Sequence, residues 1–205
     1  MNLRKAFVGA MVIPLVGCAT SKATINSFTD PSYSAQDVRS IAVLPIRNAR
    51  LAPSEAQTVT RKVSQTIHKD APKLKLLGPE ESVRILNQKG LAHDWATFVE
   101  DYVKSGVPDA TALKTFGDAL GVDALVQGEL VNIQQEDGQF GGNKGHTRVT
   151  VRFTMLSTRD GDLLWEASSD GIKTNATTIG SAPPIIEAVD LAVDKILVNL
   201  PPLGS

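Results

Sequence analysis

The sequence predicts an α/β fold, with one domain whose mixed sheet ends in an antiparallel meander and has helices packed against it. Three observations predict this fold. Residues 41–46 are apolar on both faces, as in a central strand covered on both sides. Several segments between residues 54 and 121 carry apolar side chains at helical spacing. Residues 147–155 alternate apolar and polar side chains, which is typical of a half-buried strand.

The first half of the domain is predicted to be mainly helical after its opening strand. Ser54 and Gln57 have the spacing of a capping box and predict the start of the first helix. Residues 75–77 predict a short strand. Further helices are predicted at residues 80–89, 94–105 and 110–120, with Asp109 as a cap and Gly90, Gly106 and Gly121 as stops. The middle helix carries Trp95, Phe98 and Tyr102 on one side; we expect them in the core, with a role as a contact surface as the alternative.

The second half is predicted to be mainly β-sheet. Residues 124–135 form a strand whose apolar phase slips at Leu130-Val131, which indicates a bulge. A glycine-rich loop over residues 137–145 leads to the alternating strand, and Asp160-Gly161 then predicts a hairpin turn. The return strand is expected to point Leu163, Trp165 and Ala167 inward. Pro183-Pro184 precedes a final helix with a buried apolar stripe at Ile186, Val189, Val193, Ile196, Leu197 and Leu200.

The N-terminal residues have the features of an export signal. Arg4 and Lys5 precede an apolar stretch over residues 6–16, which is short for a permanent transmembrane helix. The sequence Leu15-Val16-Gly17-Cys18 follows, and it contains the only cysteine of the chain. It closely resembles the lipobox of bacterial lipoproteins, which implies cleavage between Gly17 and Cys18. The alternatives are a plain signal peptide with an incidental cysteine, or an uncleaved membrane anchor.

The lipobox resemblance implies a lipid anchor and a location. Cys18 would carry diacylglycerol and an N-acyl chain such as palmitate, which together make a stable membrane anchor. Ala19 follows, where an acidic residue would favour the inner membrane, so we expect the outer membrane with the domain facing the periplasm. The sequence thus divides into a signal peptide (1–17), a lipidated cysteine with a flexible tether (18–38) and a folded domain (39–200).

Composition excludes some classes of partner. Removal of residues 1–17 takes away Arg4 and Lys5, so the formal net charge falls from −1 to −3. A nucleic-acid-binding protein needs a concentrated basic surface, so we expect no nucleic-acid partner. With Cys18 acylated no thiol remains, and the domain must be held by apolar burial without disulfides.

Three segments carry a family resemblance. Residues 43–46 (Val-Leu-Pro-Ile) resemble an opening "VLPF"-type strand, residues 117–130 resemble a helix-turn-strand signature, and residues 158–166 are similar to a T-x-x-G-x-x-x-W hairpin signature. Together they resemble the periplasmic lipoproteins related to the curli secretion channel lipoprotein, a group that includes the lipoprotein activators of peptidoglycan synthases and the N-terminal domain of TolB. The resemblance spans about residues 39–173. The chain lacks amphipathic insertions for membrane-spanning hairpins, so we do not expect a pore.

The search for catalytic or metal-binding residues yields none. His68, His93 and His146 have no second ligand at metal-site spacing, and no serine lies in a G-x-S-x-G pattern. The glycine-rich loop joins two strands, whereas a phosphate-binding loop precedes a helix. We expect either a flexible hairpin tip or a partner-binding loop, with Phe140 and Lys144 as the candidate contacts.

These observations favour a non-enzymatic, lipid-anchored envelope protein without a cofactor. It would bind another envelope protein and assist the assembly or regulation of a secretion or cell-envelope machine. Activation of a peptidoglycan synthase is the first alternative, and an envelope hydrolase is the alternative from another class. Self-association into a homo-oligomer is left open.

Overall fold

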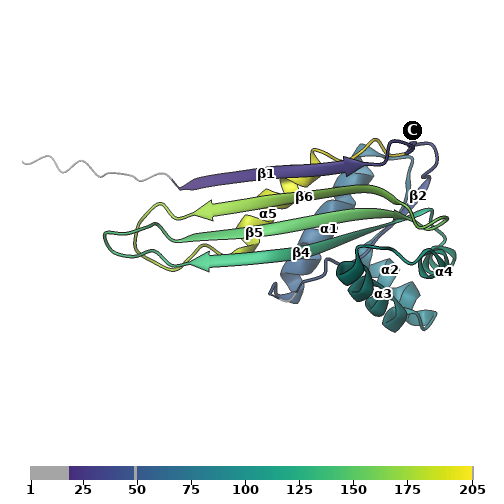
Figure 1. The fold of residues 1–205 in the computed structure, drawn as a ribbon, viewed down its shortest axis with the longest axis horizontal. Coiled ribbons are helices and arrows are strands. Elements are labelled where there is room, and N and C mark those ends of the chain that lie inside the picture. Colours follow the sequence, from purple (N-terminus) through teal and green to yellow (C-terminus); the bar gives the residue numbers. More distant parts are fainter. Residues whose placement is uncertain (1–18, 49, 205) are drawn as a thin grey trace, which may run out of the picture.

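The computed structural model describes residues 19–48 and 50–204 (Figure 1), so the predicted signal peptide, Gly17 and Cys18 lie outside the described residues. Within these residues one six-stranded sheet has the strand order β1-β6-β5-β4-β2-β3. The strands are β1 (Thr20–Thr29), β2 (Ser40–Val43), β3 (Lys75–Leu77), β4 (Ala124–Glu136), β5 (His146–Ser157) and β6 (Leu163–Thr174). The helices are α1 (Pro53–Asp70), α2 (Pro79–Gln88), α3 (Ala92–Ser105), α4 (Ala110–Leu120) and α5 (Ile185–Leu197).

The sheet is parallel on one side and antiparallel on the other. β2 pairs in parallel with both β3 and β4, while β4, β5 and β6 form an antiparallel meander. The register of β4 and β5 shifts between Leu130 and Asn132, at the predicted bulge. The prediction of a mixed sheet that ends in a meander is therefore confirmed.

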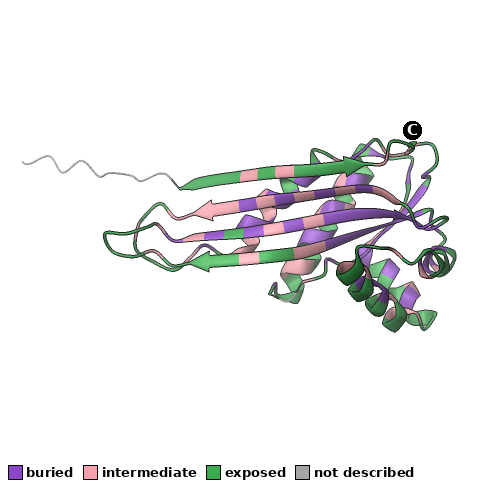
Figure 2. Ribbon diagram, in the orientation of Figure 1, coloured by how far each residue is buried: buried purple, intermediate pink, exposed green. Residues whose placement is uncertain are grey.

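Helices on both faces of the sheet create two apolar cores (Figure 2). The larger core lies between the sheet and helices α1 and α5, and the smaller one lies under α2, α3 and α4. β2 and the residue after it supply both, because Ile41 and Val43 face the larger core and Ala42 and Leu44 face the smaller one. This is why its sequence is apolar without alternation.

Local signals explain most helix ends, although two predicted starts are wrong. Asp109 caps α4 as predicted, its carboxylate accepting hydrogen bonds from the backbone of Thr111 and Ala112. Helix α1 begins before the predicted Ser54, because Pro53 occupies its first turn and the Glu55 carboxylate accepts a hydrogen bond from the Ala52 N–H. Helix α3 begins at Ala92, two residues before the predicted Asp94.

The N-terminal part of the predicted tether is a strand. Residues 20–29 form β1, which pairs antiparallel with β6 over its full length, from Thr20 opposite Thr174 to Thr29 opposite Trp165. Most of its side chains are exposed, and Ile25 packs against the larger core. An edge strand of this kind is held mainly by backbone hydrogen bonds, so it shows no apolar period. The flexible tether predicted for residues 18–38 does not extend over residues 20–29.

The β5–β6 hairpin turns at Asp160-Gly161 as predicted, but one inward residue is misassigned. Trp165 and Ala167 lie in the larger core, whereas Leu163 packs against the smaller core. The cause is a register shift between Met155 and Leu156, which turns the start of β6 toward the opposite face.

Two glycines of the sequence motifs are required by close packing. A Cβ on Gly117 would lie 2.3 Å from the Cβ of Thr158, and a Cβ on Gly128 would lie 2.5 Å from the ring of Phe153. The Thr158 hydroxyl lies 2.8 Å from the carbonyl oxygen of Val122, to which it can donate. These motif residues therefore hold α4 and β4 against the final hairpin, and their role is structural.

Trp165 is expected to be a main determinant of stability. Its side chain is 1% exposed, and its indole N–H finds no acceptor in the described part of the chain. Truncation of a buried aromatic residue to alanine costs about 3–5 kcal/mol. We predict a loss of this size for Trp165→Ala in urea unfolding, and a smaller loss for Trp165→Phe, which keeps most of the ring volume and removes the unpaired donor. Equal losses for the two variants would contradict this prediction.

Candidate functional site

The helices leave part of one sheet face uncovered. Helices α1 and α5 lie behind the four long strands β1, β6, β5 and β4, whereas α2, α3 and α4 cover the other face only toward the end where β4 begins (Figure 1). We call the uncovered part the open face. It consists of strand side chains that point away from α1 and α5, including Asn26, Phe28, Glu129, Arg148, Thr150, Arg152, Glu166, Ser168 and Asp170.

Charges of both signs alternate across the open face. Thr150 on β5 donates a hydrogen bond of 2.7 Å to the carboxylate of Asp170 on β6. Arg152 lies opposite Glu129 on β4, and Glu166 is close enough to act on Arg152 electrostatically. Such a surface does not provide the concentrated positive charge that nucleic acid requires.

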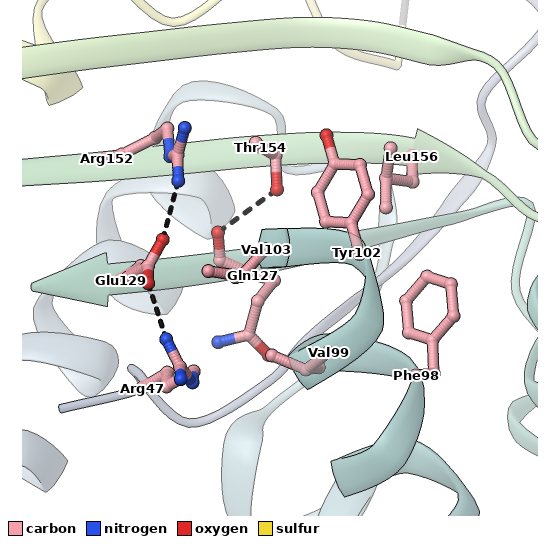
Figure 3. Close-up of a pocket in the computed structure, with 10 residues that line it drawn as sticks. All are labelled: Arg47, Phe98, Val99, Tyr102, Val103, Gln127, Glu129, Arg152, Thr154 and Leu156. Atoms are coloured by element: carbon pink, nitrogen blue, oxygen red, sulfur yellow. Dashed lines mark hydrogen bonds and ion pairs between the residues drawn. The ribbon is translucent and has the colours of Figure 1, made fainter. Parts of the chain in front are cut away.

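An arginine-carboxylate-arginine arrangement lies where the open face meets α3; we call Arg47, Glu129 and Arg152 the Glu129 cluster (Figure 3). The two carboxylate oxygens of Glu129 accept from Arg47 Nη1 at 2.5 Å and from Arg152 Nη2 at 2.7 Å. The Glu129 side chain is 12% exposed, while both arginines reach solvent. Burial lowers the pKa of Arg152, but its hydrogen bond to Glu129 and the negative charges of Glu129 and Glu166 together outweigh burial, so the pKa is raised overall.

Apolar and aromatic side chains of α3 form the other wall of this site. Phe98, Val99 and Tyr102 face the strands across a small cavity (Figure 3). Burial, and then the negative charge of Glu166, raise the pKa of the Tyr102 hydroxyl. The cavity volume is about 20 Å³, which is room for roughly one water molecule and far below the several hundred Å³ of a metabolite site. A ligand of this site must lie on the surface.

The aromatic residues predicted to belong to the core do so in part. Phe98 stacks on Tyr102 with ring centroids 6.2 Å apart and meets Phe116 edge-on at 5.7 Å. Trp95 contacts both phenylalanines. Phe98 is buried, while Trp95 and Tyr102 are half-buried at the rim of the smaller core. The cluster thus holds α3 in place and presents Tyr102 to the site.

The predicted contacts Phe140 and Lys144 lie far from the Glu129 cluster, in the loop between β4 and β5. Phe140 is 90% exposed, and Lys144 is half-buried. The loop is bridged to residues 175–184 by a hydrogen bond of 2.9 Å from the Gly138 N–H to the Gly180 carbonyl. The base of the loop is therefore hydrogen-bonded to the segment that follows β6, and the flexible tip and the partner-binding loop both stay predictions.

Other sites are less well formed. A groove of about 480 Å³ between α1 and α2 is lined by Pro45, Pro53, Pro79 and Val83. Two of its polar groups are already engaged, because the Thr60 hydroxyl is within hydrogen-bond distance of the Ala56 carbonyl and Glu80 pairs with Arg61. Within the described residues no group of three His, Cys, Asp or Glu side chains could hold a metal ion. None of the helices described is long and apolar enough to cross a membrane.

Sequence reasoning missed the Glu129 cluster. The alternation of residues 147–155 does assign Arg152 to the polar face of its strand. Its partner Glu129 lies 23 residues away, and Arg47 is separated from Glu129 by 82 residues. The register of β4 and β5 places Arg152 opposite Glu129, and a parallel bridge between the segment after β2 and β4 places Arg47 beside Glu129.

The Glu129 cluster is expected to stabilise the domain more than an exposed ion pair does. Hydrogen bonds to charged groups contribute about 1.5–3 kcal/mol, against about 0–1 kcal/mol for exposed pairs. We predict that Glu129→Gln lowers the free energy of unfolding by about 1–3 kcal/mol. The matched control is Glu80→Gln in the exposed Arg61–Glu80 pair, where Glu80 is 58% exposed. Urea unfolding measures both, and equal losses would show that Glu129 is no better paired than Glu80.

Comparisons with known proteins add a set of similar structures. No protein-family model matches the chain, and no curated protein matches its sequence. A chain of the PelC dodecamer from Paraburkholderia phytofirmans is 15% identical with a TM-score of 0.48, over 86% of this chain and 95% of that one.

Two further structures are more distant in geometry. Lipoprotein GNA1162 from Neisseria meningitidis is 14% identical with a TM-score of 0.42, over 78% of this chain and 99% of that one. The LpoB C-terminal domain from Escherichia coli is 12% identical with a TM-score of 0.38, over 68% and 87%. At such identities the likeness concerns the fold alone.

Proposed function

We propose that this chain is a lipid-anchored protein of the bacterial cell envelope that binds another envelope protein through its open face and catalyses no reaction. In this role it assists the assembly or regulation of a secretion or cell-envelope machine. The proposal includes removal of residues 1–17, lipidation of Cys18 and, because Ala19 follows, residence at the outer membrane facing the periplasm.

The observation that carries the binding role is the open face with the Glu129 cluster at its border. Arginine and tyrosine are enriched at protein interfaces and in their hot spots, and both occur here beside partly buried carboxylates. Because the cavity at the cluster holds no more than a water molecule, a partner must be recognised by its surface. A protein surface with complementary charges fits this requirement.

The first alternative, activation of a peptidoglycan synthase, requires reach across the periplasm. The tether of about twenty residues that the sequence predicts is already short for this distance. Strand β1 begins at Thr20, so half of those residues belong to the sheet and the reach is shorter still. No observation favours the second alternative, an envelope hydrolase.

Self-association is a further part of the proposal. β1 is the last strand of the sheet, and along its ten residues no other strand among the described residues pairs with its outer edge. Such an edge can accept another strand. A second copy of the chain is therefore one of the partners that the crosslinking experiment below must distinguish.

Site-specific crosslinking tests the binding surface. We expect a photo-crosslinking amino acid in place of Asn26, which is exposed on the open face, to capture a discrete partner in living cells. The same amino acid in place of Asn87, which is exposed on α2, is the matched control and should capture none. Arg152→Ala in the Asn26 background should weaken the capture.

The outcomes separate the alternatives. An adduct of twice the monomer mass would identify the partner as a second copy. Equal adducts at both positions, or adducts that persist unchanged in the Arg152→Ala variant, would contradict the open face as the binding surface.

Substitution of the cysteine tests the anchor. We expect Cys18→Ala to abolish incorporation of labelled fatty acid and to leave the precursor uncleaved or released by another peptidase. Wild-type protein should fractionate with the outer membrane. Labelled lipid on the Cys18→Ala protein would refute the anchor, whereas wild-type protein in the inner membrane would refute only the sorting by Ala19.

A further inference from the structure

One end of the sheet gathers the start of the described chain and two loops. Thr20 at the start of β1 lies opposite Thr174 at the end of β6, and Thr174 lies opposite His146 at the start of β5. His146 in turn lies opposite Glu136 at the end of β4. We call this the anchor end; in Figure 1 it carries the loop between β4 and β5 and the segment that follows β6.

Covalent geometry fixes how far a lipid on Cys18 lies from this end. Two residues span at most about 7 Å, so the Cα atom of Cys18 cannot lie farther than that from the Cα atom of Thr20. Neighbouring strands are about 4.8 Å apart, which places His146 roughly 10 Å from Thr20. A lipid anchor on Cys18 therefore holds both loops of the anchor end close to the membrane surface.

The two loops form one hydrogen-bonded unit. Besides the Gly138–Gly180 bridge, the Asn175 N–H donates to the Gly145 carbonyl at 2.8 Å, and the Ala182 N–H donates to the Asp137 carboxylate at 2.7 Å. The backbones approach so closely that a Cβ on Gly138 would lie 2.7 Å from the carbonyl oxygen of Thr178. Glycine is thus needed there for packing.

This unit presents apolar side chains to solvent. Phe140, in the first loop, is 90% exposed, and Ile179, in the second loop beside the bridge, is 59% exposed. Neither serves a core, although the backbone that carries them is held in place. Aromatic and aliphatic side chains on such a support can enter the boundary between headgroups and acyl chains.

We propose that the anchor end docks on the lipid bilayer, with Phe140 and Ile179 inserted at its surface. This inference rests on the lipidation of Cys18 in the proposed function. The sequence analysis names Phe140 as a candidate contact with a partner protein. In this proposal its partner is the lipid surface. The lipid holds the protein at the membrane, and the two loops fix its orientation. Strand β5, twelve residues and about 40 Å long, then leads away from the bilayer and carries the open face into the periplasm.

A fluorescent probe beside Phe140 tests the docking. The full mature protein carries Gln139→Cys, an exposed position that keeps Phe140 intact, and is reconstituted into vesicles of phosphatidylethanolamine and phosphatidylglycerol. The thioether on Cys18 leaves the introduced cysteine as the only thiol for an environment-sensitive dye. We expect the emission to shift to shorter wavelength on reconstitution and to be quenched by lipids spin-labelled near the headgroup.

Two variants serve as controls. Arg159→Cys places the dye in the β5–β6 turn at the opposite end of the sheet, where we expect neither shift nor quenching. Phe140→Ser with Ile179→Ser, added to Gln139→Cys, should lose the shift at position 139 while the protein still floats with the vesicles. Because both side chains are exposed, the melting temperature should stay close to that of the parent.

Each remaining outcome is informative. Equal emission at positions 139 and 159, or a shift that survives the serine substitutions, would overturn the docking. A shift that occurs in native envelope vesicles and is absent in pure lipid would overturn it in favour of a protein contact. Failure of the lipid anchor itself shows separately, because the protein without an introduced cysteine would then react with the dye at Cys18 and would not float.

Discussion

The pairing of β1 with β6 is the constraint that ties the start of the described chain to the sheet. Ten residue pairs, from Thr20–Thr174 to Thr29–Trp165, join the start of the described chain to the long strands. Because most β1 side chains are exposed, backbone hydrogen bonds of about 0.5–1.5 kcal/mol each and the packing of Ile25 hold the strand. Without this pairing the residues before β2 would form a free chain. With it, Thr20 is fixed next to two loops of the sheet, and a lipid on Cys18, as proposed, would be attached beside them.

Most of the fold could be predicted from the sequence, because it follows from two periodicities. The 3.6-residue period marked all five helices of the described chain, and the two-residue period marked β5 and β6. β1 was not predicted because Thr, Ser, Lys and Asn side chains predominate in it. Most of its side chains are exposed, so this edge strand needs no apolar face. Composition of that kind is shared with true linkers. Only the presence of β6 as a neighbour distinguishes the two.

The candidate site could be predicted only in fragments. The alternation of β5 indicates that Arg152 points away from the apolar core, and Phe140 stands out as an aromatic residue in a glycine-rich loop. Both places depend on contacts between residues far apart in the sequence. Arg47 and Arg152 both pair with Glu129, and the loop that carries Phe140 is hydrogen-bonded to residues that follow β6. Such contacts depend on strand register, which a single sequence specifies through the pattern of the whole sheet.

The bulge in β4 shows how closely the open face depends on that register. Val131 is the extra residue between Leu130 and Asn132, and it is exposed. Beyond it Ile133 lies opposite Val149 and packs against the larger core, while Asn132 lies opposite Thr150 on the open face. If Val131 instead took a regular place in the alternation, Asn132 would point toward the core and Ile133 would point to solvent. A single unpaired residue thus keeps the outer half of β4 polar on the open face, so that this face continues without interruption from the Glu129 cluster to the anchor end.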